Sequence, residues 1–341
     1  MVNYNIYQLT MTSTEKLSSQ PNLEENDLKK VEQLPTLSAL VLLFIALIAL
    51  SLAAIFIRFS EMEISSNATV FNRLWIAMTI FGVGSGIKQI QLYRSKDLIP
   101  QAVNLENFSF LNNLKLLLIM GVTSSIYITL WAWSLTQTSF ANSIVLRSLT
   151  PVFTTFFGWL FLGQYFETTF LVGIAIALCG AIVIGITDFS YSTNNITGDV
   201  AALLAAIFYG VYLLSVEKLR TRFSSSTILL WRCFIGTVLT LPIVILSEQP
   251  IFPYSLSGWL AVISQAVVCQ VLGQGLLAQS LNQLSSGFVA TSLLLEPMIT
   301  AFIAWVIFSE QLTFINCIAF CIVLLGVYLA KPRELTINTK E

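Results

Sequence analysis

Two charged side chains lie inside long apolar runs of this sequence, where a charge is energetically unfavourable. Arg147 lies within the run Phe140–Leu162, and Glu296 lies within the run Phe288–Phe308. A charge inside hydrocarbon costs about 2.5–3.5 kcal/mol on insertion scales, so each needs a partner or water. Either both line a polar cavity and meet each other or a substrate, or they form a fixed structural pair, or Arg147 reaches the nearer surface.

Uncharged polar residues add to the candidates for a substrate cavity. Gln270 and Gln274 are four residues apart, so they share one helix face, as do Arg147 and Thr150 one turn apart. Tyr209 and Tyr212 are placed to border a substrate path. The alternative for the glutamines is hydrogen bonding between helices. The predicted cavity residues are Arg147, Thr150, Tyr209, Tyr212, Gln270, Gln274 and Glu296.

Two prolines lie in the middle of the apolar runs that carry the charges. Pro151 and Pro297 each remove one backbone hydrogen bond, which frees the carbonyl four residues earlier, at Arg147 and Leu293. In lipid a free carbonyl must find another partner or water. We therefore predict a helix kink at each proline, either beside a cavity or as a packing feature without substrate contact.

Other polar and aromatic residues favour structural roles. Arg73 and Arg232 lie nearer the ends of their runs, where a long side chain can extend to the surface. Trp75, Trp131 and Trp133 also lie near run ends, which predicts anchoring at the membrane–water interface.

The composition excludes several classes of function. Histidine is absent, which removes the commonest general base and metal ligand. The five cysteines lie in apolar runs without a Cys-x-x-Cys pair, so no metal site and no cofactor is predicted. The net charge of −1 offers no basic face to nucleic acid. There is no Gly-x-x-x-x-Gly-Lys-Ser/Thr loop for a nucleotide. No catalytic residue is therefore predicted.

The elements that must position these residues are membrane-spanning helices. Only 10% of the residues are charged, against roughly 25% in soluble domains, so most of the surface must face hydrocarbon. Ten apolar runs lie near the roughly 20 residues that a spanning helix needs. They cover Thr36–Ile57, Thr69–Gln91, Leu114–Leu135, Phe140–Leu162, Thr168–Thr187, Gly198–Val216, Ser226–Leu246, Gly258–Ala278, Phe288–Phe308 and Phe314–Ala330. The sequence predicts an all-α membrane protein with ten transmembrane helices.

The distribution of cations predicts the orientation. Most Lys and Arg residues lie in the tails and in the loops on the same side, as with Lys218, Arg220 and Arg222 after the sixth run. Such loops face the cytoplasm. We therefore predict both termini in the cytoplasm and the protein in the plasma (inner) membrane. Residues 1–35 are expected to be a disordered polar tail, and residues 332–341 a short cytoplasmic tail.

The second half of the chain repeats the first, closely in the third to fifth runs. Before them the match is looser: Ala53-Ala-Ile-Phe matches Ala205-Ala-Ile-Phe, and Arg73 matches Arg232, each near an aromatic residue. Placing Leu149 on Leu295 needs no gap and aligns further pairs: Ser134 with Ser280, Gln137 with Gln283, Pro151 with Pro297, Trp159 with Trp305 and Gly180 with Gly326. This predicts two five-helix repeats, 36–188 and 198–331. Because five is odd, the second enters the membrane from the opposite side, which makes them inverted repeats.

The repeated segment resembles the EamA domain of the drug/metabolite transporter superfamily. The resemblance rests on Ala132-Trp-Ser-Leu, Leu149-Thr-Pro and Leu162-Gly-Gln, and on Ala278-Gln-Ser-Leu, Leu295-Glu-Pro and Phe308-Ser-Glu. Two copies cover roughly residues 36 to 331. The sequence departs from the family pattern at Gln164, where a Glu is usual, and at Arg147.

The resemblance implies a ten-helix permease with a central cavity that exports small metabolites such as amino acids. The expected function is a secondary transporter, and not an enzyme, that works by alternating access. Its expected partners are the lipid bilayer and a small-molecule substrate, with a coupling proton or ion and the oligomeric state left open. The alternatives are a membrane enzyme for lipid-like substrates, and a scaffold or sensor that transports nothing.

Overall fold

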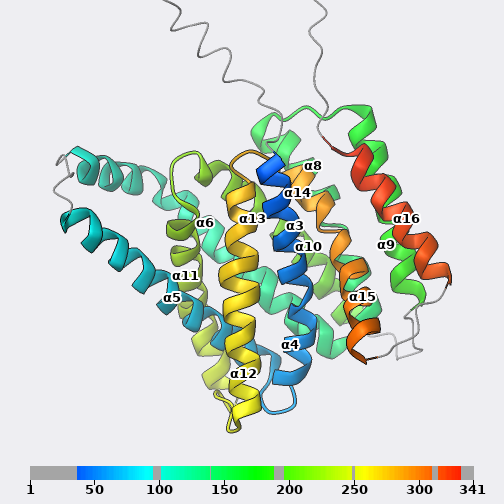
Figure 1. The fold of residues 1–341 in the computed structure, drawn as a ribbon, viewed down its shortest axis with the longest axis horizontal. Coiled ribbons are helices and arrows are strands. Elements are labelled where there is room, and N and C mark those ends of the chain that lie inside the picture. Colours follow the sequence, from blue (N-terminus) through cyan, green and yellow to red (C-terminus); the bar gives the residue numbers. More distant parts are fainter. Residues whose placement is uncertain are drawn as a thin grey trace, which may run out of the picture. The chain divides into compact units, whose positions relative to one another are not determined.

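The computed structural model describes residues 37–94, 101–138, 140–187, 196–247, 250–308 and 314–331. The described residues form helices and connecting turns, with no strand among them (Figure 1). The two predicted tails, 1–35 and 332–341, lie outside this part of the chain.

The helices of the two halves follow the predicted apolar runs. The first half contains α3 (Leu37–Ser51), α4 (Ala53–Ser60), α5 (Ser66–Arg94), α6 (Gln101–Gln137), α7 (Phe140–Arg147), α8 (Thr150–Leu162) and α9 (Thr168–Thr187). The second half contains α10 (Ile196–Arg220), α11 (Ser225–Leu246), α12 (Leu256–Ser264), the π-helix η1 (Gln265–Gly273), α13 (Gln274–Ser280), α14 (Ser286–Ser292), α15 (Leu295–Phe308) and α16 (Phe314–Leu329).

Eight helical stretches in the described residues have the length and apolar composition to cross a membrane. They are Leu37–Ile57, Ser66–Ile87, Asn113–Gln137, Ser143–Leu162, Ile196–Arg220, Ser225–Leu246, Leu256–Ser280 and Ser286–Ile303. Two shorter apolar helices, Thr168–Val183 and Cys317–Leu329, correspond to the fifth and tenth predicted runs. The all-helical membrane architecture agrees with the sequence, whereas the count of ten spans stays a prediction.

The fourth and ninth runs are each broken into two helices next to a proline. α7 ends at Arg147 and α8 begins at Thr150, while α14 ends at Ser292 and α15 begins at Leu295. The Thr150 hydroxyl donates to the Arg147 carbonyl at 2.7 Å, and the Glu296 N–H donates to the Leu293 carbonyl at 3.0 Å. These are the two carbonyls that Pro151 and Pro297 leave without a helical donor.

The eighth run changes its helical type in the middle. α12 passes into η1 at Gln265, and η1 passes into α13 at Gln274. A π-helix of this length is rare, because single turns are the rule. Its wider turn directs Gln265, Cys269, Gln270 and Gly273 inward together, and all four are buried.

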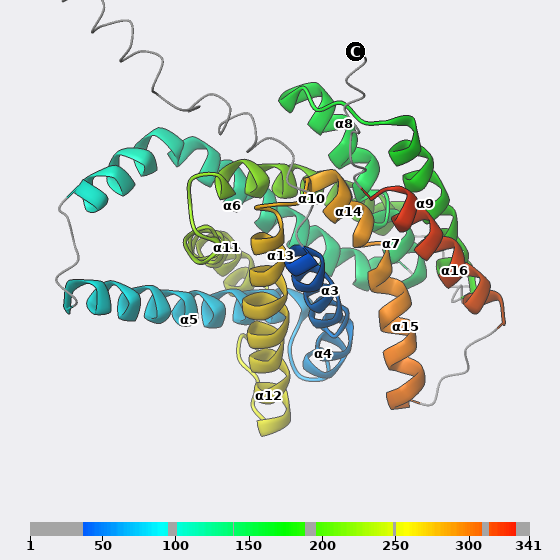
Figure 2. The same cartoon turned by 45° about the horizontal axis from the view of Figure 1, so that its top comes forward.

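The helices α9 and α16 pack so closely that their backbones touch. A Cβ at Gly326 would lie 2.6 Å from the Cβ of Ala177, and one at Gly180 would lie 2.9 Å from the carbonyl oxygen of Ala319. Only glycine fits at such a contact. Figure 2 shows the two helices side by side, and α9 is among the neighbours of α7 and α15.

Candidate functional site

A small cavity of about 60 Å³ brings residues of both halves together. Its polar lining includes Arg73, Arg147, Tyr209, Gln274 and Glu296. Ordinary ligand pockets have roughly 300–1,000 Å³. In this conformation the cavity is therefore too small for an ordinary small-molecule ligand.

A larger hollow of about 480 Å³ lies at helix ends, away from these charges. It is lined by Glu61, Ile64, Ser65, Ser66, Asn67, Trp133, Thr136 and Ser247, and none of the predicted cavity residues is among them. We place the candidate site at the smaller cavity, because charges buried in a membrane protein need a reason to be there.

The structure joins Arg147 and Glu296 in an ion pair across the two halves. The Nη2 atom of Arg147 donates to Oε2 of Glu296, and both side chains are largely buried. The broken helices explain the placement, since Arg147 ends α7 and Glu296 lies in the first turn of α15. A helix C-terminus favours a cation and an N-terminus favours an anion, so both helix dipoles stabilise this pair.

Aromatic rings surround the Arg147 guanidinium. Its Cζ atom lies 4.6 Å from the centre of the Trp131 ring and 5.9 Å from that of Tyr209. Tyr209 in turn packs against Tyr127 at 4.4 Å between ring centres. Trp131 is buried, so its predicted place at the membrane interface was wrong. Its position at the end of an apolar run did not reveal that the Arg147 guanidinium, at the end of α7, lies over its ring.

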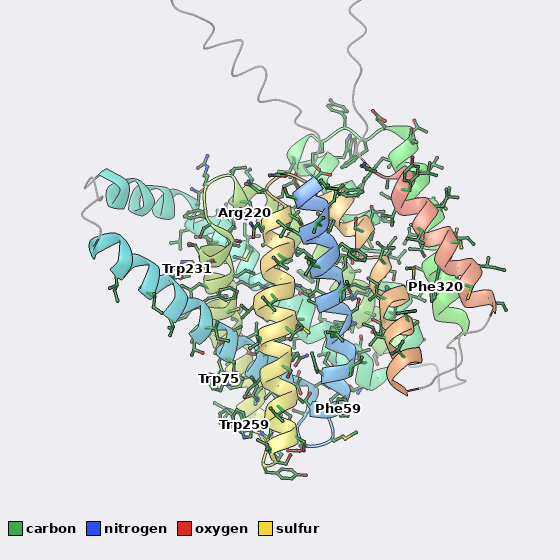
Figure 3. The ribbon with its side chains drawn as sticks, in the orientation of Figure 1. Phe59, Trp75, Arg220, Trp231, Trp259 and Phe320 are labelled. Carbon is green, nitrogen blue, oxygen red and sulfur yellow. The ribbon has the colours of Figure 1, made fainter. Side chains whose placement is uncertain are left out.

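The interface prediction fits the other two tryptophans better. Trp133 is 41% exposed, and the Trp75 indole is only partly buried. Figure 3 shows Trp75 and Trp259 near the same end of the helices. Trp259 stacks on Phe252 with the ring planes at 11°. An aromatic cluster at one end of spanning helices is typical of an interfacial belt.

The two predicted glutamines lie on one side of the same span but accept hydrogen bonds from different arginines. Gln274 lines the cavity, and its Oε1 atom accepts from Arg232 at 2.8 Å and from the Tyr212 hydroxyl at 3.2 Å. Gln270 does not line the cavity; its Oε1 atom accepts from Nε of Arg73 at 2.9 Å. Tyr212 is also fully buried behind the cavity wall.

Thr150 and Pro151 line a smaller void of about 20 Å³ that shares Arg147, Tyr209 and Pro297 with the cavity. Thr150 is buried, and its hydroxyl donates to the backbone rather than to a neighbouring helix. The two prolines therefore lie beside the charged pair.

Arg73 and Arg232 do not extend to the surface as predicted. Arg73 is 4% exposed and Arg232 is 1% exposed, so both are core residues. Arg232 donates to the hydroxyls of Tyr127 at 2.7 Å and Tyr212 at 3.2 Å besides Gln274. The two arginines occupy matched places in the two repeats, each near an aromatic residue. This match was the signal in the sequence that could have identified them as buried residues.

A carboxylate outside the spans ties the two halves together. Glu63, in the loop after α4, accepts from the backbone N–H groups of Tyr254 and Ser255 at 3.2 Å each, and from the Ser255 hydroxyl. The hydroxyl contact is the main cause that lowers the pKa of Glu63. Burial follows and opposes it, and the backbone amides of Ser255, Tyr254 and Gly258 lower it further. Ser255 also caps α12 through the N–H of Gly258.

This lowered pKa predicts a pH-dependent contribution to stability. A group whose folded pKa is depressed stabilises the fold above its unfolded value, near 4.5, and loses that effect as pH falls through the folded pKa. Glu63→Gln should therefore lower the melting temperature at pH 7, with a difference that disappears under acid conditions. Glu167→Gln, at an exposed glutamate, is the control, and a pH-independent difference would contradict the assignment.

Comparisons with known proteins identify the family. The EamA-like transporter family matches residues 37–186 and 196–331. The pseudopaline exporter CntI of Pseudomonas aeruginosa is 24% identical over 195 residues, which is 57% of this chain and 67% of that protein. A probable terminal-alkyne amino-acid exporter of Streptantibioticus cattleyicolor is 23% identical over 274 residues, 77% of this chain and 83% of that protein.

A solved crystal structure has the same fold, with a TM-score of 0.69 at 16% identity over 86% of this chain and 96% of the other. The family match covers most of the chain, and the apolar helices agree with it. This chain is therefore an integral membrane protein that belongs to the EamA-like transporter family.

Proposed function

We propose that this protein is a secondary transporter that exports a small polar or amphipathic metabolite, such as an amino acid, through the cavity around Arg147 and Glu296. The observation that carries the proposal is the ion pair held between two broken helices, one from each half. Irregular backbone at membrane depth is tolerated where it borders a cavity, and substrate sites of secondary transporters lie at such places. The two relatives described above, named as exporters, support the same direction of transport.

The proposal includes alternating access between two inverted repeats, residues 36–188 and 198–331. The neighbour relations of the helices support it, because exchanging the halves maps several of the main contacts onto one another. α6 with α10 corresponds to α13 with α3, α11 with α6 corresponds to η1 with α5, and α10 with α8 corresponds to α3 with α15. The pairs α9 with α16 and α5 with α11 map onto themselves.

In this proposal the seven predicted residues form the cavity and its support. Arg147, Tyr209, Gln274 and Glu296 line the space that a substrate would enter. Thr150 holds the backbone at the break, while Tyr212 and Gln270 hold the two further arginines. The small volume of the cavity agrees with a state in which the substrate path is closed.

The proposed topology has ten spans in the plasma (inner) membrane with both termini cytoplasmic. Reporter fusions after Lys96 and after Arg222 should therefore report the cytoplasm, and a fusion at Asn195 should report the outside. The reason is the cation content of the loops on the cytoplasmic side. An external signal at Arg222 would overturn the orientation, and equal signals at Arg222 and Asn195 would overturn the span count.

The test of transport is flux in liposomes. Purified protein should carry labelled amino acids or related small metabolites out of loaded vesicles, and protein-free vesicles should retain them. Conversion of a lipid or solute without flux would instead favour the membrane enzyme. Absence of both from a folded, correctly oriented protein would favour the scaffold or sensor.

A further inference from the structure

The cavity of the proposed transporter holds more positive than negative charge. Arg147 and Glu296 neutralise each other, which leaves Arg73 as a second cation in the lining. In the part of the chain that the structure describes, no carboxylate pairs with Arg73. Its partner is the neutral amide of Gln270, so its charge is not compensated. An uncompensated charge at membrane depth is costly and is by default a functional feature.

The same lining presents hydrogen-bond donors without acceptors. A guanidinium has five N–H donors, and only the Nε donor of Arg73 is engaged within the described residues. The indole Nε1 of Trp131 is buried at 8% residue exposure and has no partner there. Both groups donate and neither accepts. Because buried polar groups are normally paired, the missing component is an acceptor that carries negative charge.

The repeat supplies an internal comparison for Arg73. Its counterpart Arg232 is held by three neutral groups, Tyr127, Tyr212 and Gln274, and its Cζ atom lies 4.6 Å from the Tyr212 ring centre. Arg232 does not line the cavity, whereas Arg73 does. Two arginines in matched positions thus differ in how far protein groups satisfy them. The less satisfied one borders the space that a substrate would enter.

We propose that the transported substrate carries a carboxylate and that Arg73 binds it with its two Nη atoms. This inference rests on the proposed transport function. Gln270 fixes the Nε side of the guanidinium from the π-helix, which leaves the opposite edge for a two-pronged contact. One lining cation in excess matches the single negative charge of a carboxylate better than a phosphate, which carries about −1.5 to −2 near neutral pH.

The test compares L-leucine and L-phenylalanine with leucinamide and phenylalaninamide, which replace only the carboxylate. Ligands that bind the folded state raise its melting temperature by mass action. The acids should stabilise the purified wild-type protein and be exported from liposomes, and the amides should do neither. Losing a hydrogen bond to a charged group should weaken binding by about tenfold or more.

Variants assign the effect to Arg73. Arg73→Gln should lose the preference for acids, and its ligand-free melting temperature should equal or exceed that of the wild type because a buried charge is gone. Arg73→Lys should retain part of the preference. Arg222→Gln makes the same chemical change at an exposed site and should retain all of it.

The outcomes separate this inference from the function on which it rests. Equal export of acids and amides by the wild type would overturn the carboxylate assignment and leave the transporter intact. An Arg73→Gln protein that keeps the preference, or that unfolds more easily without ligand, would reduce Arg73 to a structural residue. No export or stabilisation by any of the four compounds, with folded protein, would overturn the assignment, while export of some other metabolite would still support transport.

Discussion

Removing either member of the Arg147–Glu296 pair is expected to lower stability by about 3–5 kcal/mol and to abolish transport. Arg147→Ala leaves the Glu296 carboxylate buried without its cation, and Glu296→Ala leaves the reverse. The double variant removes both charges, so it should fold better than either single variant. It should remain inactive if the pair or one of its members contacts the substrate. Thermal unfolding in detergent and flux in liposomes measure the two effects separately.

A charge reversal adds a control for the role of the helix ends. In Arg147→Glu combined with Glu296→Arg, the ion pair can form again, but each charge meets the wrong end of its helix. Each mismatch costs about 0.3–1 kcal/mol, so the reversed pair should be less stable than the wild type. Single variants with normal stability and flux would contradict the role of the pair altogether. A double alanine variant that regains transport would leave it a structural role only.

The second large effect is expected at the contact between α9 and α16. A leucine at Gly326 would have to fit where a Cβ already lies 2.6 Å from the Ala177 Cβ and 2.7 Å from its Cα. Extra atoms in a packed site cost about 1–3 kcal/mol, and here backbones must separate, so about 3 kcal/mol or more is expected. The melting temperature of purified Gly326→Leu measures this loss.

Gly84→Leu is the matched control, because a Cβ at Gly84 meets nothing within 4 Å. It should melt close to the wild type. Gly180→Leu, at the counterpart position in the first half, should resemble Gly326→Leu because its Cβ would crowd the Ala319 carbonyl. If all three leucine variants have the same melting temperature, the close approach of the two helices is not a source of stability.

Hydrophobic patterning predicted most of the architecture, because membrane spans differ from loops in composition over long stretches. The breaks beside Pro151 and Pro297 were also predictable, since proline removes a specific donor. The π-helix at Gln265–Gly273 was not, because a change from i−4 to i−5 bonding has no characteristic composition. The sequence also did not reveal that α9 and α16 approach within backbone contact.

Some residues of the candidate site could be predicted from the sequence, and others could not. A charge in the middle of an apolar run, such as Glu296, can be recognised as a candidate site residue from sequence alone, because burying it in a membrane is energetically costly. Arg73 and Trp131 lie nearer run ends, where position along the chain suggests the surface. Their burial depends on which neighbouring helices cover them, and that information belongs to the tertiary structure.

The π-helix makes two corresponding spans unequal in shape, although α6 and the α12–η1–α13 span align in sequence without a gap. The segment of α6 that corresponds to Gln265–Gly273 is Ile119–Tyr127, and it is an ordinary α-helix. If the halves exchange conformations when the substrate path changes sides, the wide turn must leave the second half and arise at Ile119–Tyr127. Tyr127, at the end of this segment, contacts both Tyr209 and Arg232. A change from α-helical to π-helical hydrogen bonding there would rotate the Tyr127 side chain about the helix axis. The hydrogen bond that Arg232, in the other half, donates to the Tyr127 hydroxyl would then depend on the helical type of this span.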